Sequence, residues 1–228
     1  MTTRLRAASF QDNAVTTAKI AADAVTAAKI PANAIGSSEL DLTASYAFSG
    51  TVTGAGDPSQ MVLLQTQTVS GDTTVDVGSS SLFTSTYKIY QIHIINVHPS
   101  NNGAHFACKM GTGGSIISAN YEYAREQVLH GGSSIRGSNS AGTVDLCESV
   151  GNEANEHLCQ VHTLYNPAGT TFTKLVNFYG TSVDLTPNKA ANNGMYSNEG
   201  FVTAIDRIQF YFTSGTMDSG TFKLYGIK

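Results

Sequence analysis

The sequence has no tryptophan, and charged residues occupy only 13% of its 228 positions. Its 13 lysines and arginines are scattered and form no basic run, so we expect no nucleic-acid partner. It has no apolar run of 18 residues, and its first twelve residues lack the apolar core of a signal peptide. The sequence therefore predicts no membrane insertion.

Cysteine is also scarce. Cys108, Cys147 and Cys159 are an odd number at irregular spacing, and the sequence has no Asn-x-Ser/Thr glycosylation signal. These features favour reduced thiols in a protein made in a cytosol over a disulfide scaffold.

Residues 13–42, here called the repeat segment, repeat themselves every ten positions, with Asn13, Asp23 and Asn33 in equivalent places. Large apolar residues recur every five positions, at Val15, Ile20, Val25, Ile30, Ile35 and Leu40. A continuous helix would rotate successive members of this series by about 140°, and a strand would place them on alternate faces. A single chain therefore has no one surface on which to bury them.

We interpret the repeat segment as an oligomerisation stalk. The Asn or Asp of each repeat can begin a tight turn, and Pro31 forces Ile30 towards an extended conformation. Turns alternating with extended links would let three parallel copies bring their Val and Ile side chains together in layers, because a threefold axis closes such an assembly. The alternative interpretation is a disordered linker rich in Ala and Thr.

Residues 43–60 are small, polar and glycine-rich, and they predict a neck. From residue 61 onwards, a region here called the body, strand-like runs are separated by turn clusters, without an amphipathic helix of ten residues. The runs are 61–70, 73–78, 88–97, 104–110, 121–129, 143–149, 157–166, 174–183, 207–214 and 221–228. This pattern predicts an all-β fold, an antiparallel β-sandwich of the jelly-roll kind.

The run at 88–97 alternates clearly, with Tyr90, Ile92 and Ile94 on one face and Ile89 and Ile95 on the other. Because both faces carry apolar side chains, we expect a central strand.

The C-terminal run has a pattern of its own. Gly215 and Gly220 are expected to frame a hairpin turn, after which Phe222, Leu224 and Ile227 would point inward. A final strand of this kind would be part of the core.

The sequence predicts no catalytic residue, cofactor site or metal site. The glycines of "MGTGGSI" (110–116) indicate a hairpin turn rather than a phosphate cradle, because no helix opens after them. Cys159 and His162 lie three apart on an expected strand and would face opposite sides. The G-x-S-x-G elbow is absent, and carboxylates are sparse. Segments 121–123, 166–170 and 188–200 are the expected contact loops.

Three patterns resemble those of bacteriophage virion proteins. They are the decad "NAVTTAKI", the stretch "NVHPSNNGAHFACKM" (96–110) and the ending "SGTFKLYGIK" (219–228), which is similar to the terminus of phage tail-fibre proteins. The resemblance covers residues 13–42 and 61–228. It implies a trimeric, non-enzymatic appendage with an N-terminal virion anchor at 1–12, a stalk, a neck and a β-sandwich head. Arg4, Leu5, Arg6 and Phe10 would form the anchor.

This resemblance implies a short tail fibre or spike tip that contacts the host surface. The alternatives are a capsid head fibre or decoration protein and, in a different class, a β-sandwich that binds or cleaves glycans. The expected partners are two further copies of the chain, a tail adaptor or major capsid protein, and a host surface glycan or protein. The expected location is the virion, after synthesis in the host cytoplasm.

Overall fold

The structure, a computed structural model, describes residues 26, 61–186 and 188–228. The predicted anchor, the neck and, apart from Thr26, the repeat segment lie outside the described residues. Within the described residues the fold is all-β, as predicted, and contains no helix. Its strands are β1 (Met61–Val69), β2 (Val75–Val77), β3 (Ile89–Pro99), β4 (Ala104–Thr112), β5 (Ser115–Ile116), β6 (Tyr121–Leu129), β7 (Gly132–Ala141), β8 (Val144–Val150), β9 (Leu158–Tyr165), β10 (Val176–Val183), β11 (Lys189–Asn198), β12 (Arg207–Phe212) and β13 (Met217–Ile227).

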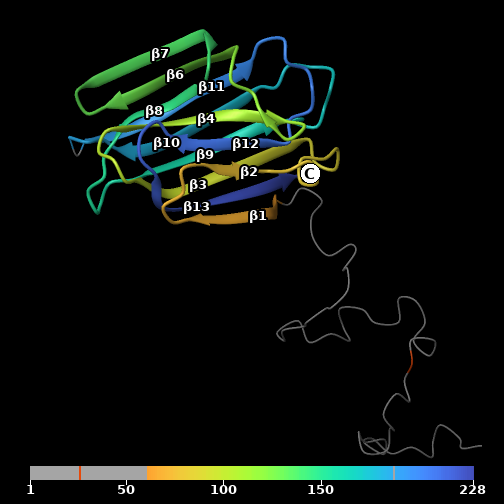
Figure 1. The fold of residues 1–228 in the computed structure, drawn as a ribbon, viewed down its shortest axis with the longest axis horizontal. Coiled ribbons are helices and arrows are strands. Elements are labelled where there is room, and N and C mark those ends of the chain that lie inside the picture. The colour runs from red at the N-terminus through yellow and green to blue at the C-terminus, as the bar shows by residue number, and fades with distance from the viewer. Residues whose placement is uncertain (1–25, 27–60, 187) are drawn as a thin grey trace, which may run out of the picture. The chain divides into compact units, whose positions relative to one another are not determined.

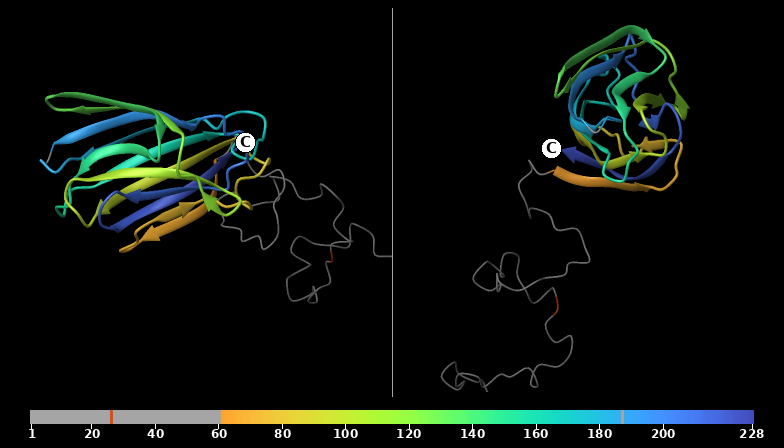
Figure 2. Two further views of the ribbon diagram at one scale, coloured as in Figure 1. Left: turned by 45° about the horizontal axis from the view of Figure 1, so that its top comes forward. Right: turned by 90° about the vertical axis from the view of Figure 1, so that its left-hand side faces the viewer.

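The strands form two antiparallel sheets (Figure 1). The larger sheet has eight strands in the order β1-β13-β3-β9-β10-β11-β6-β7. The smaller sheet has the order β2-β12-β4-β5, and β8 pairs with β4. Figure 2 shows the larger sheet curving around the smaller one. Most neighbours in the larger sheet are distant in sequence, so the fold depends on non-local pairing.

The core lies between the two sheets. The ring of Phe210 on β12 lies 5.6 Å from Phe222 on β13 and 5.1 Å from His162 on β9, measured between centroids. These contacts join the inner faces of the sheets, in keeping with a β-sandwich. The largest fully buried side chains are Tyr90, Tyr121, Tyr196, Phe106, Phe210, Phe222, Ile92, Ile94, Met110, Leu146, Leu158 and Leu164.

Strand β3 confirms the alternation expected from its sequence. Tyr90, Ile92 and Ile94 are buried, while Ile95 faces outward, and β3 lies between β13 and β9. Asn96 then adopts a positive φ of 51°, and the pairing with β9 shifts at this point. A shifted register of this kind is a β-bulge, which restores Val97 to the buried face.

Strands β7 and β11 are not among the predicted runs, and 188–200 is predicted as a contact loop. Strand β11 occupies most of 188–200, because Ala190, Asn192 and Tyr196 alternate inward, and the buried Asn192 hides the apolar pattern. Strand β7 carries almost no apolar residue and is the edge of the larger sheet. The short β5 was also missed. Residues 121–123 begin β6, whereas 166–170 do form a loop.

The C-terminal hairpin prediction was wrong. Strand β12 belongs to the smaller sheet and β13 to the larger one, so residues 213–216 cross between the sheets. The reason is that both strands have one strongly apolar face, and the two faces meet across the core. Phe222 and Leu224 are buried as expected. Ile227 is three positions after Leu224, so in the alternation of the strand its side chain lies on the outward face, where it is half-buried.

Candidate functional site

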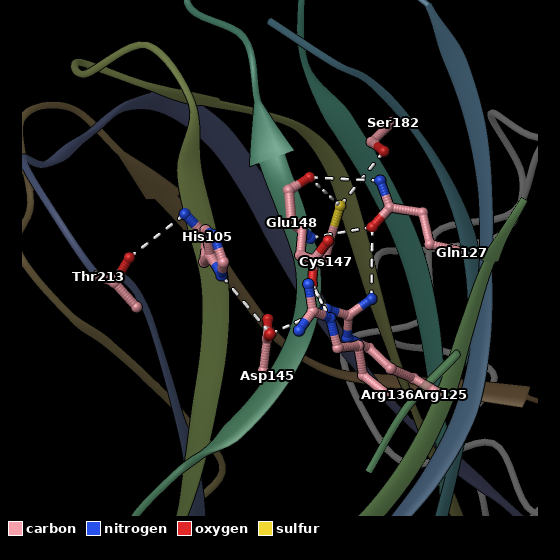
Figure 3. A network of polar contacts seen from close by, with 9 residues as sticks. All are labelled: His105, Arg125, Gln127, Arg136, Asp145, Cys147, Glu148, Ser182 and Thr213. Atoms are coloured by element: carbon pink, nitrogen blue, oxygen red, sulfur yellow. Dashed lines mark hydrogen bonds and ion pairs between the residues drawn. The ribbon is translucent and has the colours of Figure 1, made fainter. Parts of the chain in front are cut away.

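The most concentrated polar cluster of the body centres on Arg125 of β6 (Figure 3). Its guanidinium is fully buried, and Nη2 donates to Asp145 Oδ2 at 2.9 Å and to Glu148 Oε1 at 2.7 Å. Both acids lie on β8, which belongs to the other sheet. The cluster therefore ties the two sheets together by charge where β8 lies against β6.

Neighbouring side chains complete this cluster. Gln127 Oε1 accepts from Arg125 Nη1 and from the Glu148 amide, at 3.4 and 3.0 Å. The exposed Arg136 of β7 also forms an ion pair with Glu148. His105 Nδ1 on β4 lies 3.5 Å from Asp145 Oδ2. The cluster thus joins four strands and includes both sheets (Figure 3).

The electrostatics of this cluster suit ion pairing rather than proton transfer. Burial alone would raise the pKa of Glu148, but the charge of Arg125 and its hydrogen bond, with Arg136, outweigh burial and hold the pKa below its ordinary value. Glu148 is therefore ionised at neutral pH, whereas a general acid needs a raised pKa. Burial raises the pKa of the adjacent Cys147 thiol to about 12, so this thiol is not a nucleophile at neutral pH.

His162 is the second buried titratable group of interest. One ring nitrogen, Nδ1, lies 3.0 Å from Tyr196 Oη, and Nε2 lies 3.1 Å from Gln160 Oε1. The ring stacks on Phe178. Burial lowers the pKa of His162 to about 3, so the ring is neutral in the folded protein. As predicted, Cys159 lies on the opposite face of β9.

We predict that His162 makes the body sensitive to acid. The unfolded chain takes up a proton at His162 near its ordinary pKa of 6.5, and the folded chain does so only near 3, so stability falls as pH drops through this window. One such group costs about 2 kcal/mol between pH 7 and pH 5. Urea unfolding of the protein and of His162→Gln at both pH values measures this. The variant should lose about that much of the pH dependence, and an unchanged dependence would contradict the prediction.

A cavity of 540 Å³ lies beside the glycine turn of "MGTGGSI". Gly113 and Gly114, both with positive φ, form a two-residue hairpin turn between β4 and β5, as expected. The Gly114 amide donates to Asp206 Oδ2 at 3.0 Å, and Arg207 Nε donates to Oδ1 at 2.8 Å. Arg207 also pairs with Asp76. The Arg207 guanidinium is thus already paired with two carboxylates, which disfavours its use for a phosphate.

The exposed apolar side chains gather at one end of the body. Strand pairing puts Met61, Ile227, Ile89 and Tyr165 in one row at the end where the chain enters β1 and leaves β13. Lys174 Nζ donates to the carbonyls of Phe172 and Val202, which brings these two loops together at the same end. Among residues 61–186 and 188–228, twelve large apolar side chains are exposed, and seven of these lie at or near this end: Met61, Val62, Leu63, Tyr165, Phe172, Leu175 and Val202. We call this set the apolar end.

Sequence reasoning did not find the apolar end, because its members come from three separate segments that only strand pairing and the Lys174 hydrogen bonds bring together. The predicted oligomerisation residues and anchor residues lie outside the described part of the chain, so their roles stay predictions.

Comparison with protein-family models, with curated proteins and with solved structures finds no match for this chain. No group of three His, Cys, Asp or Glu side chains that could hold a metal ion occurs in residues 61–186 and 188–228. The described residues also include no helix that is long and apolar enough to cross a bilayer. The functional argument therefore rests on the chain's own geometry.

Proposed function

We propose that the chain is a structural protein of a bacteriophage virion. In this proposal it assembles as a trimer through the repeat segment, and its body contacts the host surface. A short tail fibre or spike tip fits this description best. A capsid head fibre or decoration protein would use the same assembly at another place on the particle.

The observation that carries the proposal is the apolar end. Large exposed apolar patches on soluble proteins mark interaction sites, and this one surrounds the point at which the chain enters the body. A neck of 18 residues spans at most ~60 Å. If three repeat segments associate, their necks hold the three bodies close together, at an effective concentration of roughly millimolar. At that concentration even a weak contact between their apolar ends forms. The opposite end and the outer sheet face stay free for a partner.

Light scattering on the full chain tests this assembly. We expect three times the chain mass of 24.0 kDa. The variant Ile20→Asp/Ile30→Asp should have the mass of one chain, because it puts charges into the apolar series of the repeat segment. The matched control Thr17→Asp/Thr26→Asp adds the same charge outside the apolar series and should stay trimeric. A full chain that is monomeric at all concentrations would overturn the proposal.

A second variant tests the apolar end within the assembled protein. Phe172→Ser/Leu175→Ser removes two side chains that are 76% and 49% exposed, so the fold of the body should survive. On dilution, we expect this variant trimer to dissociate at a higher protein concentration than the unmodified trimer, because its subunits associate more weakly. An unchanged dissociation curve would show that the apolar end takes no part in assembly.

A further inference from the structure

The outward side of the larger sheet has an uncharged central region. Its outward positions on β3, β9, β10 and β11 are Gln91, His93, Ile95, Cys159, Val161, Thr163, Asn177, Tyr179, Thr181, Ala191, Asn193 and Met195. None of these is acidic, Lys or Arg. Partial burial and the nearby charge of Lys223 lower the pKa of His93, so this ring is neutral at pH 7. Charged side chains border this region: Lys223 on β13, Glu126 on β6 and the exposed Lys189 at the start of β11.

A groove of 360 Å³ crosses this region. Side chains of β3, β9 and β10 line it, namely His93, Ile95, Cys159, Val161, Tyr179 and Thr181. Its volume lies at the small end of the range for ligand pockets, about 300–1,000 Å³. Its lining is mostly apolar.

Tyr179 lines this groove, and the residue is 59% exposed. Strand pairing places it between Val161 and Asn193, and the next outward residue on its own strand is Asn177. On the far side of the groove, His93 Nε2 lies 3.2 Å from Gln91 Oε1. An exposed aromatic face is thus flanked by amide and imidazole groups that can both donate and accept hydrogen bonds.

We propose that this groove binds a neutral glycan, with a sugar ring stacked on Tyr179 and its hydroxyl groups bonded by the neighbouring amides. A sugar ring offers an apolar C–H face together with hydroxyl groups around its rim, and the groove offers the matching arrangement. The assignment rests on the proposed function, in which the body contacts the host surface, and it names the ligand class.

Charge and area favour a neutral glycan over other partners. An anionic glycan would find cations only at the border of the region, Lys223 on β13 and Lys189 at the start of β11. A stable protein partner buries about 800 Å² on each side. Between β3 and β11 this surface offers three large exposed apolar side chains, Ile95, Tyr165 and Tyr179, and Tyr165 lies at the end of β9, so few remain to build the core of such an interface.

A glycan array probed with the labelled full chain tests the assignment. The array carries neutral oligosaccharides, with sialylated and sulfated ones for comparison. We expect binding to neutral members only. Tyr179→Ala should weaken it about tenfold through loss of the stacked ring, and Tyr179→Phe should keep most of it. The matched control Ile135→Ala removes a 78% exposed side chain at the sheet edge and should bind normally.

Three results would overturn the assignment: binding to no glycan, binding to anionic glycans only, or full binding by Tyr179→Ala. Failure here is distinguishable from failure of the proposed function. A trimeric chain that binds no glycan contradicts the groove assignment alone. A monomeric chain whose glycan binding depends on Tyr179 contradicts the proposed function and leaves the groove assignment standing.

Discussion

Removal of residues 221–228 should leave a chain that does not fold. These residues form most of β13, which lies between β1 and β3 and pairs with both. They include Phe222 and Leu224, which are fully buried. Truncating one such side chain to alanine typically costs about 2–5 kcal/mol, and a whole domain is stable by only about 5–15 kcal/mol. Loss of both side chains and two strand ladders exceeds that margin.

Circular dichroism during thermal unfolding measures the outcome. We expect the truncated chain to be insoluble or to show no cooperative transition. Removing Lys228 alone, an exposed residue beyond the end of β13, should leave the transition unchanged. A truncated chain with a native near-ultraviolet spectrum and a cooperative transition would contradict the placement of β13 within the sheet.

Replacing Arg125 by methionine should destabilise the body by about 3–5 kcal/mol. The guanidinium is fully buried between Asp145 and Glu148, so its loss leaves two carboxylates side by side with no buried cation to neutralise them. Methionine fills much of the volume of the arginine stem, so the effect measured is mainly electrostatic. Urea unfolding at pH 7 gives the change in the free energy of unfolding.

Two controls separate charge from packing. Arg136→Met removes a cation from the same cluster, but one whose side chain is 58% exposed, and it should cost about 1 kcal/mol or less. The triple variant Arg125→Met/Asp145→Asn/Glu148→Gln removes the unpaired charges and should recover part of the lost stability. If the triple variant is no more stable than Arg125→Met, the cluster around Arg125 does not stabilise the body through its charges.

Strands with a strong alternation could be predicted from the sequence, and the others could not. Strand β3 alternates bulky apolar residues on one face, and its position and burial were as expected. Strand β11 buries Asn192, and β7 contributes no residue to the fully buried core, so both lack the apolar signal. Burial of a polar side chain depends on hydrogen bonds from other strands, such as the one from Asn192 to Ser182.

The candidate sites depend on pairing that no local pattern shows. Arg125 and its two carboxylates are 20 and 23 residues apart in sequence and lie on different sheets. Tyr179 becomes part of a groove only because β10 pairs with β9 in a register that puts it opposite Val161.

The central claim, that this is an assembled virion protein, is tested most directly by gold-labelled antibodies against the full chain. Phage particles are purified from cultures that produce the chain, and the labelled particles are viewed by electron microscopy. We expect label at the tail tip or along tail fibres. Label over the capsid would assign the chain to head decoration and leave the virion role intact. Particles that carry no label, from cultures in which the soluble chain is abundant, would contradict the account.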